Sequence, residues 1–290
     1  MKTNQIAIIS LVIGGFLTLT SCQKTDSPEP NSSGGGVNYT AGNLITNEGS
    51  FGNANGSISF YNSTTDAVVN GIFTLENSRP LGDVVQSVTK FGNSAYICVN
   101  ASNKVEVVHA ASFKEEATIA GITQPRYMVA NNTTGYVSSW GNNGEVTMIN
   151  LNDNSISGSI AVGSGPERMA ISNNNLYVAN SGGYGKDSTI SVINLTTNTV
   201  TNTIDIGAYN PSAIVNGVGN TVWILAKGTV IYDASWNIIG HEPSKLIELN
   251  TSSNTIISTT ELFTDKHPSN VEISLDQSTL YFGGSYGFSG

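Results

Sequence analysis

The side chains that could carry out chemistry are few and scattered along this sequence of 290 residues. The three histidines, His109, His241 and His267, stand in different sequence contexts, and neither an HxH nor an HExxH motif occurs. The sequence also has no CxxC pair and no EF-hand spacing, and no GxSxG motif or Gly-rich phosphate loop follows a strand and opens a helix. It therefore predicts neither a metal site nor a nucleophilic catalytic centre. We expect a protein that is not an enzyme and that needs no cofactor.

The composition favours an all-β protein and argues against nucleic-acid binding. Only 11% of the residues are charged, the formal net charge is −9, and Lys and Arg form no cluster. The basic surface that DNA or RNA binding requires is therefore missing. No segment after residue 40 shows the Ala, Leu, Glu and Lys pattern of a long helix, whereas Asn, Thr, Ser and Gly are abundant.

Residues 1–22 read as an export signal. Lys2 precedes an apolar run from Ile6 to Leu19 that is too short for a typical membrane-spanning helix. Leu19-Thr20-Ser21-Cys22 resembles the bacterial lipobox, which implies that Cys22 carries the lipid and becomes the mature N-terminus. The alternative is a simple secretory signal with a chance cysteine. If Cys22 is lipidated, Cys98 has no partner for a disulfide within the chain, and we expect Cys98 to be a buried strand residue.

Residues 23–38 read as a flexible tether, because QKTDSPEPNSSGGG has almost no apolar side chain to bury. Asp26 and Glu29 weakly resemble the acidic signal that sends lipoproteins of Bacteroidota to the cell surface. We therefore expect a lipid-anchored protein of the outer membrane at the cell surface, held to the membrane through the anchor alone.

Residues 39–290 contain an internal repeat with three recurring marks. The first is the head of an apolar strand, at Leu44, Tyr96, Tyr136, Tyr177, Trp223 and Tyr281. The aromatic heads recur once per repeat on a strand that should be buried, so we expect Tyr96, Tyr136, Tyr177, Trp223 and Tyr281 to pack in the core. The second is an Asn followed four residues later by Asn or Asp and six residues later by Val or Ile, at Asn62/Asp66/Val68, Asn150/Asn154/Ile156, Asn194/Asn198/Val200 and Asn250/Asn254/Ile256. The third is a proline, at Pro80, Pro125, Pro166, Pro211 and Pro268. Agreement among three marks indicates a true repeat.

Each mark has a structural reason. Asn and Asp tolerate the left-handed backbone of tight hairpins, so NLTTNTV and NSTTDAV predict reversals between antiparallel strands. LYVAN at 176–180 is typical of a strand covered on both faces, and TVTNTIDI at 199–206 of an outer strand with one wet face. The prolines fit the first residue of an inner strand, where a missing N–H is tolerated. The prolines are 41 to 57 residues apart, and repeats of this length that contain four strands are typical of propeller blades.

The pattern of YVAN, ISVINLTTNTV, TIDIG and a following proline resembles YncE-like β-propellers with YVTN repeats, and the DUF5074-like surface lipoproteins of Bacteroidota. The resemblance implies an all-β propeller of four-stranded blades, nominally seven. The chain supplies a partial first blade (43–75), four full blades (80–120, 125–162, 166–206 and 211–259) and the opening half of a sixth. We therefore expect a propeller truncated in the sixth blade, with a genuine five- or six-bladed ring as the alternative.

Two sets of loops converge on one end of a propeller, the mouth, which is the default ligand site. The loops entering the inner strands carry Asp83, Arg126, Tyr127, Glu167, Arg168, Ser212 and Asn270. Those joining the second and third strands carry Phe51, Trp140, Asn142, Tyr184, Lys186 and Tyr286. An insertion in blade five adds Tyr232, Trp236 and His241, either above the mouth or in a hairpin that covers its own apolar residues.

The resemblance extends to corrinoid (vitamin B12) capture lipoproteins that sit on TonB-dependent transporters, and it implies those two partners. The expected contacts are Trp140, Tyr184 and Trp236 for the macrocycle and its base, and Arg126, Arg168 and Asn142 for amide and phosphate oxygens. Tyr127 and His241 complete the predicted ligand site. The alternatives are an adhesion or scaffold propeller that binds protein or glycan, and a propeller lyase with one histidine as general base.

Overall fold

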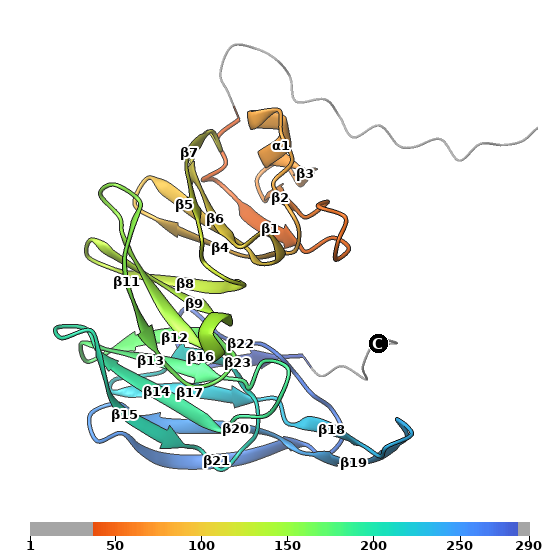
Figure 1. Cartoon of the computed structure of the whole chain (residues 1–290), viewed down its shortest axis with the longest axis vertical. Helices are drawn as coiled ribbons and strands as arrows, with labels where there is room; N and C mark the ends of the chain where they lie inside the picture. Colours follow the sequence, from red (N-terminus) through yellow and green to blue (C-terminus); the bar gives the residue numbers. More distant parts are fainter. Residues whose placement is uncertain (1–36, 284–290) are drawn as a thin grey trace, which may run out of the picture.

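The computed structural model describes residues 37–283, which form consecutive antiparallel sheets arranged as an arc about a common axis (Figure 1). We number the sheets as blades in chain order. Blade one consists of β1 (Asn43–Asn47), β2 (Ser57–Asn62) and β3 (Ala67–Val69), followed by the short helix α1 (Ile72–Asn77). No helix among residues 37–283 has the length and apolar character needed to cross a membrane.

Blades two to five are complete four-stranded meanders, as the sequence predicts. Blade two contains β4 (Val85–Phe91), β5 (Ser94–Val99), β6 (Lys104–His109) and β7 (Glu115–Ala120). Blade three contains β8 (Pro125–Asn131), β9 (Thr134–Ser139), β10 (Glu145–Asn150) and β11 (Ser155–Ala161). Blade four contains β12 (Pro166–Ser172), β13 (Asn175–Asn180), β14 (Thr189–Asn194) and β15 (Thr199–Asp205). Blade five contains β16 (Pro211–Asn216), β17 (Thr221–Ala226), β20 (Ser244–Asn250) and β21 (Thr255–Phe263).

Blade five carries an inserted hairpin, and a two-stranded sheet follows blade five. The hairpin of β18 (Thr229–Tyr232) and β19 (Ile238–Glu242) projects from the end of blade five (Figure 1). The last described sheet pairs β22 (Val271–Ile273) with β23 (Leu280–Phe282) and opens blade six. Two short 3₁₀ turns, η1 (Asn100–Ser102) and η2 (Gly141–Asn143), lie in the loops that join the second and third strands.

The inner strands lie next to one another around the axis. β4 contacts β8, β8 contacts β12, β12 contacts β16, and β16 contacts β22. β1 contacts β4 much as the second strands β9 and β13 contact the next inner strand, so blade one begins at its second strand. Three of the repeat prolines, Pro125, Pro166 and Pro211, are the first residues of inner strands, as expected, whereas Pro80 and Pro268 precede theirs by a few residues.

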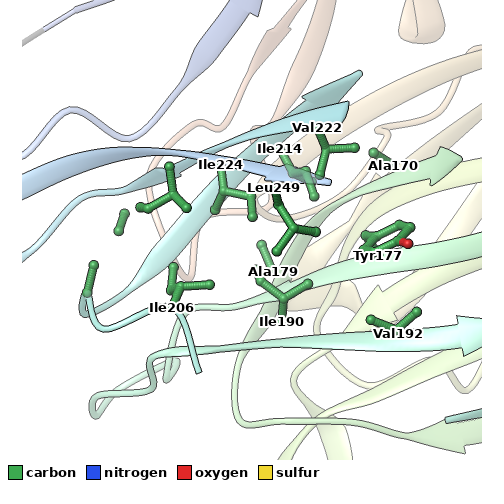
Figure 2. Close-up of a cluster of buried hydrophobic side chains, with 13 residues drawn as sticks. Ala170, Tyr177, Ala179, Ile190, Val192, Ile206, Ile214, Val222, Ile224 and Leu249 are labelled. Carbon is green, nitrogen blue, oxygen red and sulfur yellow. The ribbon is translucent and has the colours of Figure 1, made fainter. Parts of the chain in front are cut away.

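Apolar layers between neighbouring blades form the core. Between blades four and five, Tyr177, Ile190 and Val192 face Ile224 and Leu249 (Figure 2). The second strand β13 is fully buried from Leu176 to Ala179, which confirms the reading of LYVAN. Cys98 is buried in β5, also as predicted, and burial raises the pKa of its thiol to about 12.

The recurring tyrosines hydrogen-bond to the turn of the next blade. The hydroxyl of Tyr96 donates to Oδ1 of Asn154 (3.3 Å), that of Tyr136 to Asn198 (3.0 Å), and that of Tyr177 to Asn254 (2.8 Å). The turn residues that accept these bonds all have positive φ, namely Asn154 (59°), Asn198 (52°) and Asn254 (56°). Two of the three sequence marks are therefore the two halves of one contact between blades.

The junction between blades one and two replaces this contact with an apolar one. Blade one has Leu44 at the tyrosine position, and blade two has Phe113, with φ 56°, at the turn position. Leu44 packs against the buried cluster that contains Phe113. The two departures from the repeat therefore compensate each other.

One predicted core position is wrong within the described residues. Tyr281 was expected to be buried like the other strand heads, but it is 60% exposed. It lies in β23, whose partners in the described chain are limited to β22, so no outer strand covers it. The inserted hairpin does not cover all of its own apolar residues, because Ile238 and Ile239 on β19 are exposed.

Candidate ligand site at the mouth

Bulges at the start of the inner strands position the first group of mouth side chains. The pairing register shifts between Val85 and Ser87 in β4, between Pro125 and Met128 in β8, and between Pro166 and Met169 in β12. Residues within a bulge leave the regular ladder, and bulges commonly redirect side chains beside functional sites. The bulged residues are Gln86, Arg126, Tyr127, Glu167 and Arg168.

Residues at the second position of three successive inner strands form a polar chain across blades two, three and four. Nη1 of Arg126 donates to Oε1 of Gln86 (2.5 Å), and Nη2 of Arg126 lies 2.9 Å from Oε1 of Glu167. Both members of the ion pair are largely buried. Burial raises the pKa of Glu167, and the nearby cations Arg126, Lys227 and Arg168 oppose the rise.

An aromatic corner lies beside this chain. The guanidinium carbon of Arg126 sits 4.4 Å from the ring centre of Trp140, and the rings of Trp140 and Tyr184 meet edge to face at 5.2 Å. Gln124 donates to the Tyr184 hydroxyl (3.1 Å). The structure thus brings Arg126, Trp140 and Tyr184 into contact from blades three and four.

A shallow groove of about 320 Å³ borders the aromatic corner. Its walls are Trp140, Tyr184 and a glycine-rich backbone that includes Gly165 and Gly183. Gly165 has a φ of 58°, and a Cβ there would collide with the backbone of Gly183. The groove therefore depends on glycine where the loops of blade four approach each other.

Tyr127 and Arg168 form a second contact, at the head of the central cavity. The guanidinium carbon of Arg168 lies 4.7 Å from the ring centre of Tyr127, whose hydroxyl accepts a hydrogen bond from Nε2 of Gln86 (3.1 Å). Nη1 of Arg168 lies 3.6 Å from Oε1 of Glu272 on β22. The cavity, of about 420 Å³, runs between the inner strands and is lined at this end by Gln86, Tyr127 and Arg168.

The remaining predicted residues lie apart from these two contacts. Asn142 is exposed on η2 with φ 52°, and its amide donates to Glu145 instead of joining the aromatic corner. Trp236, 80% exposed, is in the turn of the β18–β19 hairpin beside Tyr232. His241 is on β19 and hydrogen-bonds to His267. The predicted lipid position Cys22 and the loop residue Tyr286 lie outside the described residues.

Gln86 and Gln124, which the sequence pattern does not predict as site residues, bind Arg126 and Tyr184 directly. Gln86 was detectable in principle, because it occupies the same strand position as Arg126 and Glu167 in successive blades. Gln124 immediately precedes Pro125, but nothing in its sequence context marks it as a site residue.

Unsatisfied polar atoms also gather at the mouth. Within residues 37–283, the buried side-chain atoms without a hydrogen-bond partner are Oδ1 of Asp83, Nε1 of Trp140, Oδ1 of Asn180 and Oδ1 of Asn210. Asp83 and Asn210 precede inner strands, Asn180 ends a second strand, and Trp140 directly follows one, so all four lie at the mouth end of their blades. Buried polar groups are normally paired, so these four atoms are exceptions among the described residues.

The fold is that of known propeller-like structures. The chain is similar to a Kuenenia stuttgartiensis hydrazine synthase structure (17% identity, TM-score 0.59, 71% of this chain), of which it spans 59%. It is also similar to a chain of the mitotic checkpoint complex (11% identity, TM-score 0.61, 98% of this chain and 82% of that one). A third match is the Neurospora crassa Pan2 WD40 domain (9% identity, TM-score 0.57, 82% of this chain and 67% of that one). At these identities the similarity extends to the fold alone.

The sequence comparisons place the chain in a family. No curated protein matches the chain. The model of the family described as Domain of unknown function (DUF5074) matches residues 41–288, which span nearly all of the predicted propeller. The chain therefore belongs to the DUF5074 family.

Proposed function

We propose that this propeller is a non-enzymatic binding protein whose mouth captures a large planar ligand with a polar rim, a corrinoid being the specific candidate. The observation that carries the proposal is the contact of Arg126 and Tyr184 with Trp140 beside the groove. Aromatic faces and edges contribute binding energy through apolar area, and a neighbouring guanidinium serves amide and phosphate oxygens.

A further feature supports a polar-rimmed ligand. The Gln86–Arg126–Glu167 chain holds the guanidinium in one orientation, so little side-chain entropy is lost when a ligand binds.

The proposed setting is the cell surface. In this proposal Cys22 carries a lipid that anchors the chain to the outer membrane, and residues 23–38 tether the propeller. The captured ligand then passes to a TonB-dependent transporter. The support for this setting is the lipobox-like Leu19-Thr20-Ser21-Cys22 and the low apolar content of the tether.

Titration of cyanocobalamin into the full chain, followed by calorimetry, tests the ligand. We expect saturable binding with a dissociation constant of about 1 μM or lower. Trp140→Ala should weaken binding about 30-fold, the equivalent of about 2 kcal/mol for an aromatic anchor, and leave the circular dichroism spectrum unchanged. Phe91→Ala is the matched control, because Phe91 is an exposed aromatic at the β4–β5 turn, at the opposite end of its blade. Absence of saturable binding to the wild-type chain would end the corrinoid proposal.

A second candidate function is adhesion or scaffolding, with a protein or glycan as partner. Phe51, Tyr184 and Trp236 are each at least 80% exposed, and each lies in a loop that joins a second and a third strand. Exposed aromatics spread over blades one, four and five suit a broad partner surface. Loss of partner capture from cell extracts by Phe51→Ser and Trp236→Ser, with cyanocobalamin binding absent, would favour this function.

A further inference from the structure

His241 and His267 form the end of a hydrogen-bond chain at the base of the β18–β19 hairpin. Nδ1 of His241 lies 3.0 Å from Nε2 of His267, and Nδ1 of His267 lies 2.7 Å from the backbone oxygen of Lys227. The ring centres are 5.3 Å apart with an interplanar angle of 21°. That separation is close to the nitrogen–nitrogen distance plus one ring radius on each side, so the rings meet edge to edge and the hydrogen bond lies along the line between them.

The chain fixes the tautomer of both neutral rings. A carbonyl oxygen only accepts, so Nδ1 of His267 carries the proton and its Nε2 is a lone pair. That lone pair accepts from Nδ1–H of His241, which leaves Nε2 of His241 as a lone pair too. Among residues 37–283, Nε2 of His241 takes part in no hydrogen bond.

This arrangement is the one that metal-binding histidines use. A ligating imidazole usually donates its second N–H to a carbonyl, carboxylate or other acceptor, which orients the ring and raises its basicity. Here His267 is that acceptor for His241, and the Lys227 carbonyl orients His267 in turn. The half-buried ring of His241 is therefore held in one orientation, with the lone pair of Nε2 free to bind a metal.

The histidine pair adjoins the mouth. Lys227 follows β17, its backbone N–H donates to the carbonyl of Asn210 (3.0 Å), and its ammonium lies close enough to Glu167 to affect the pKa of that carboxyl group. Asn210 and Glu167 both stand at the start of inner strands. Lys227 thus lies between the histidine pair and the site that contains Arg126.

One imidazole is too few ligands for a free metal ion. The described residues contain no group of three or more His, Cys, Asp and Glu side chains arranged to hold one. Stable metal sites in proteins usually take three or four such ligands. The metal that suits a single oriented imidazole is one whose other positions are already filled by its own chelating ring.

We infer that Nε2 of His241 is an axial ligand to the cobalt of a corrinoid with an exchangeable axial position. The inference rests on the proposed function and assigns this residue its role within it. In the exchange, the bond from Co(III) to an axial water breaks, the bond from cobalt to Nε2 forms, and water leaves. No electron is transferred, and Nδ1 of His241 keeps its proton, so the imidazole stays neutral.

Absorption spectroscopy of the full chain with aquocobalamin tests the assignment. Aquocobalamin mixed with free imidazole supplies the reference spectrum of an imidazole complex. We expect the wild-type chain to shift the aquocobalamin bands to those of the reference, and His241→Ala to abolish the shift. Cyanocobalamin, whose cyanide occupies the axial position, should show no such shift with either chain. His109→Ala is the matched control, because His109 lies in the outer turn of blade two, and it should keep the shift.

A second variant tests the role of His267. His267→Ala removes the acceptor for Nδ1–H of His241, and loss of such a partner typically lowers metal affinity about 10- to 100-fold. We expect this loss for aquocobalamin and none for cyanocobalamin.

The outcomes separate the inference from the proposed function. Cyanocobalamin binding without an aquocobalamin band shift in the wild type overturns the axial-ligand assignment and leaves the proposed function standing. A shift that survives His241→Ala also overturns the assignment. Binding of neither corrinoid removes the proposed function, and the inference falls with it.

Discussion

Removing the hydroxyl group of Tyr177 should measure how strongly neighbouring blades are held together. Tyr177 is fully buried, and its oxygen lies 2.8 Å from Oδ1 of Asn254 and 2.9 Å from the carbonyl oxygen of Thr251, so one proton serves two acceptors. Tyr177→Phe removes a hydrogen bond and leaves buried acceptors without a donor, at a cost of about 2 kcal/mol. For a domain of this size the melting temperature should fall by about 4–8 °C.

The sister tyrosines and a double-mutant cycle supply the controls. Tyr96 makes a longer bond (3.3 Å) to one acceptor, so Tyr96→Phe should cost less than Tyr177→Phe in urea unfolding. Asn254→Gly removes the acceptor and tolerates the positive φ of that position, so the cycle reports the side-chain contact. We expect a coupling of about 1 kcal/mol. Additivity within about 0.3 kcal/mol, or equal losses for both Tyr→Phe variants, would refute the reasoning.

Three further predictions concern pH, charge and backbone. Burial raises the folded-state pKa of Tyr177 from 10.0 to about 12, so its contribution to stability should be complete below pH 10 and decline between pH 10 and 12; alkaline unfolding of Tyr177→Phe, which lacks this step, provides the check. Glu106→Gln should cost on the order of 3 kcal/mol in urea unfolding, because buried Glu106 pairs with Arg79 at 2.9 Å and with Lys104; a cost as small as that of Glu115→Gln, at the exposed end of Arg79, would contradict it. Gly165→Ala should abolish cyanocobalamin binding by displacing the loop wall of the groove. Gly121→Ala, also at positive φ but with open space where its added Cβ would lie, should leave calorimetric binding unchanged.

The sequence predicted the fold well because a repeat shows the same physical constraint several times. Asn194 and Asn198 bracket a hairpin with a left-handed residue, and the structure has that turn where the pattern places it. LYVAN is buried on both faces, and β15 is the exposed outer strand. The prediction for Tyr281 was wrong, because its type and spacing match the repeat while its burial depends on outer strands that its two-stranded sheet does not have among the described residues.

The sequence predicted which end of the blades carries the site, but not which side chains contact one another there. Topology alone places Arg126 and Tyr184 at the same end of their blades, so the sequence brings them together. The partners of Arg126 depend on bulges in β4, β8 and β12, which pairing register decides and composition does not reveal. The hydrogen bond between His241 and His267 joins an insertion to the loop before blade six, and no repeat position relates those two residues.

The matched substitutions Leu44 and Phe113 bear on how such a chain can diversify by gene duplication. Blades three and four offer a tyrosine to the following blade and an asparagine to the preceding one, so a copied blade of this type would find compatible neighbours on both sides. At the boundary between blades one and two, the same copy would set a tyrosine hydroxyl against Phe113, or Leu44 against an asparagine amide. Exchange of blades should therefore be tolerated in the middle of the arc and selected against at the boundary between blades one and two. Blades one and two would then be inherited together.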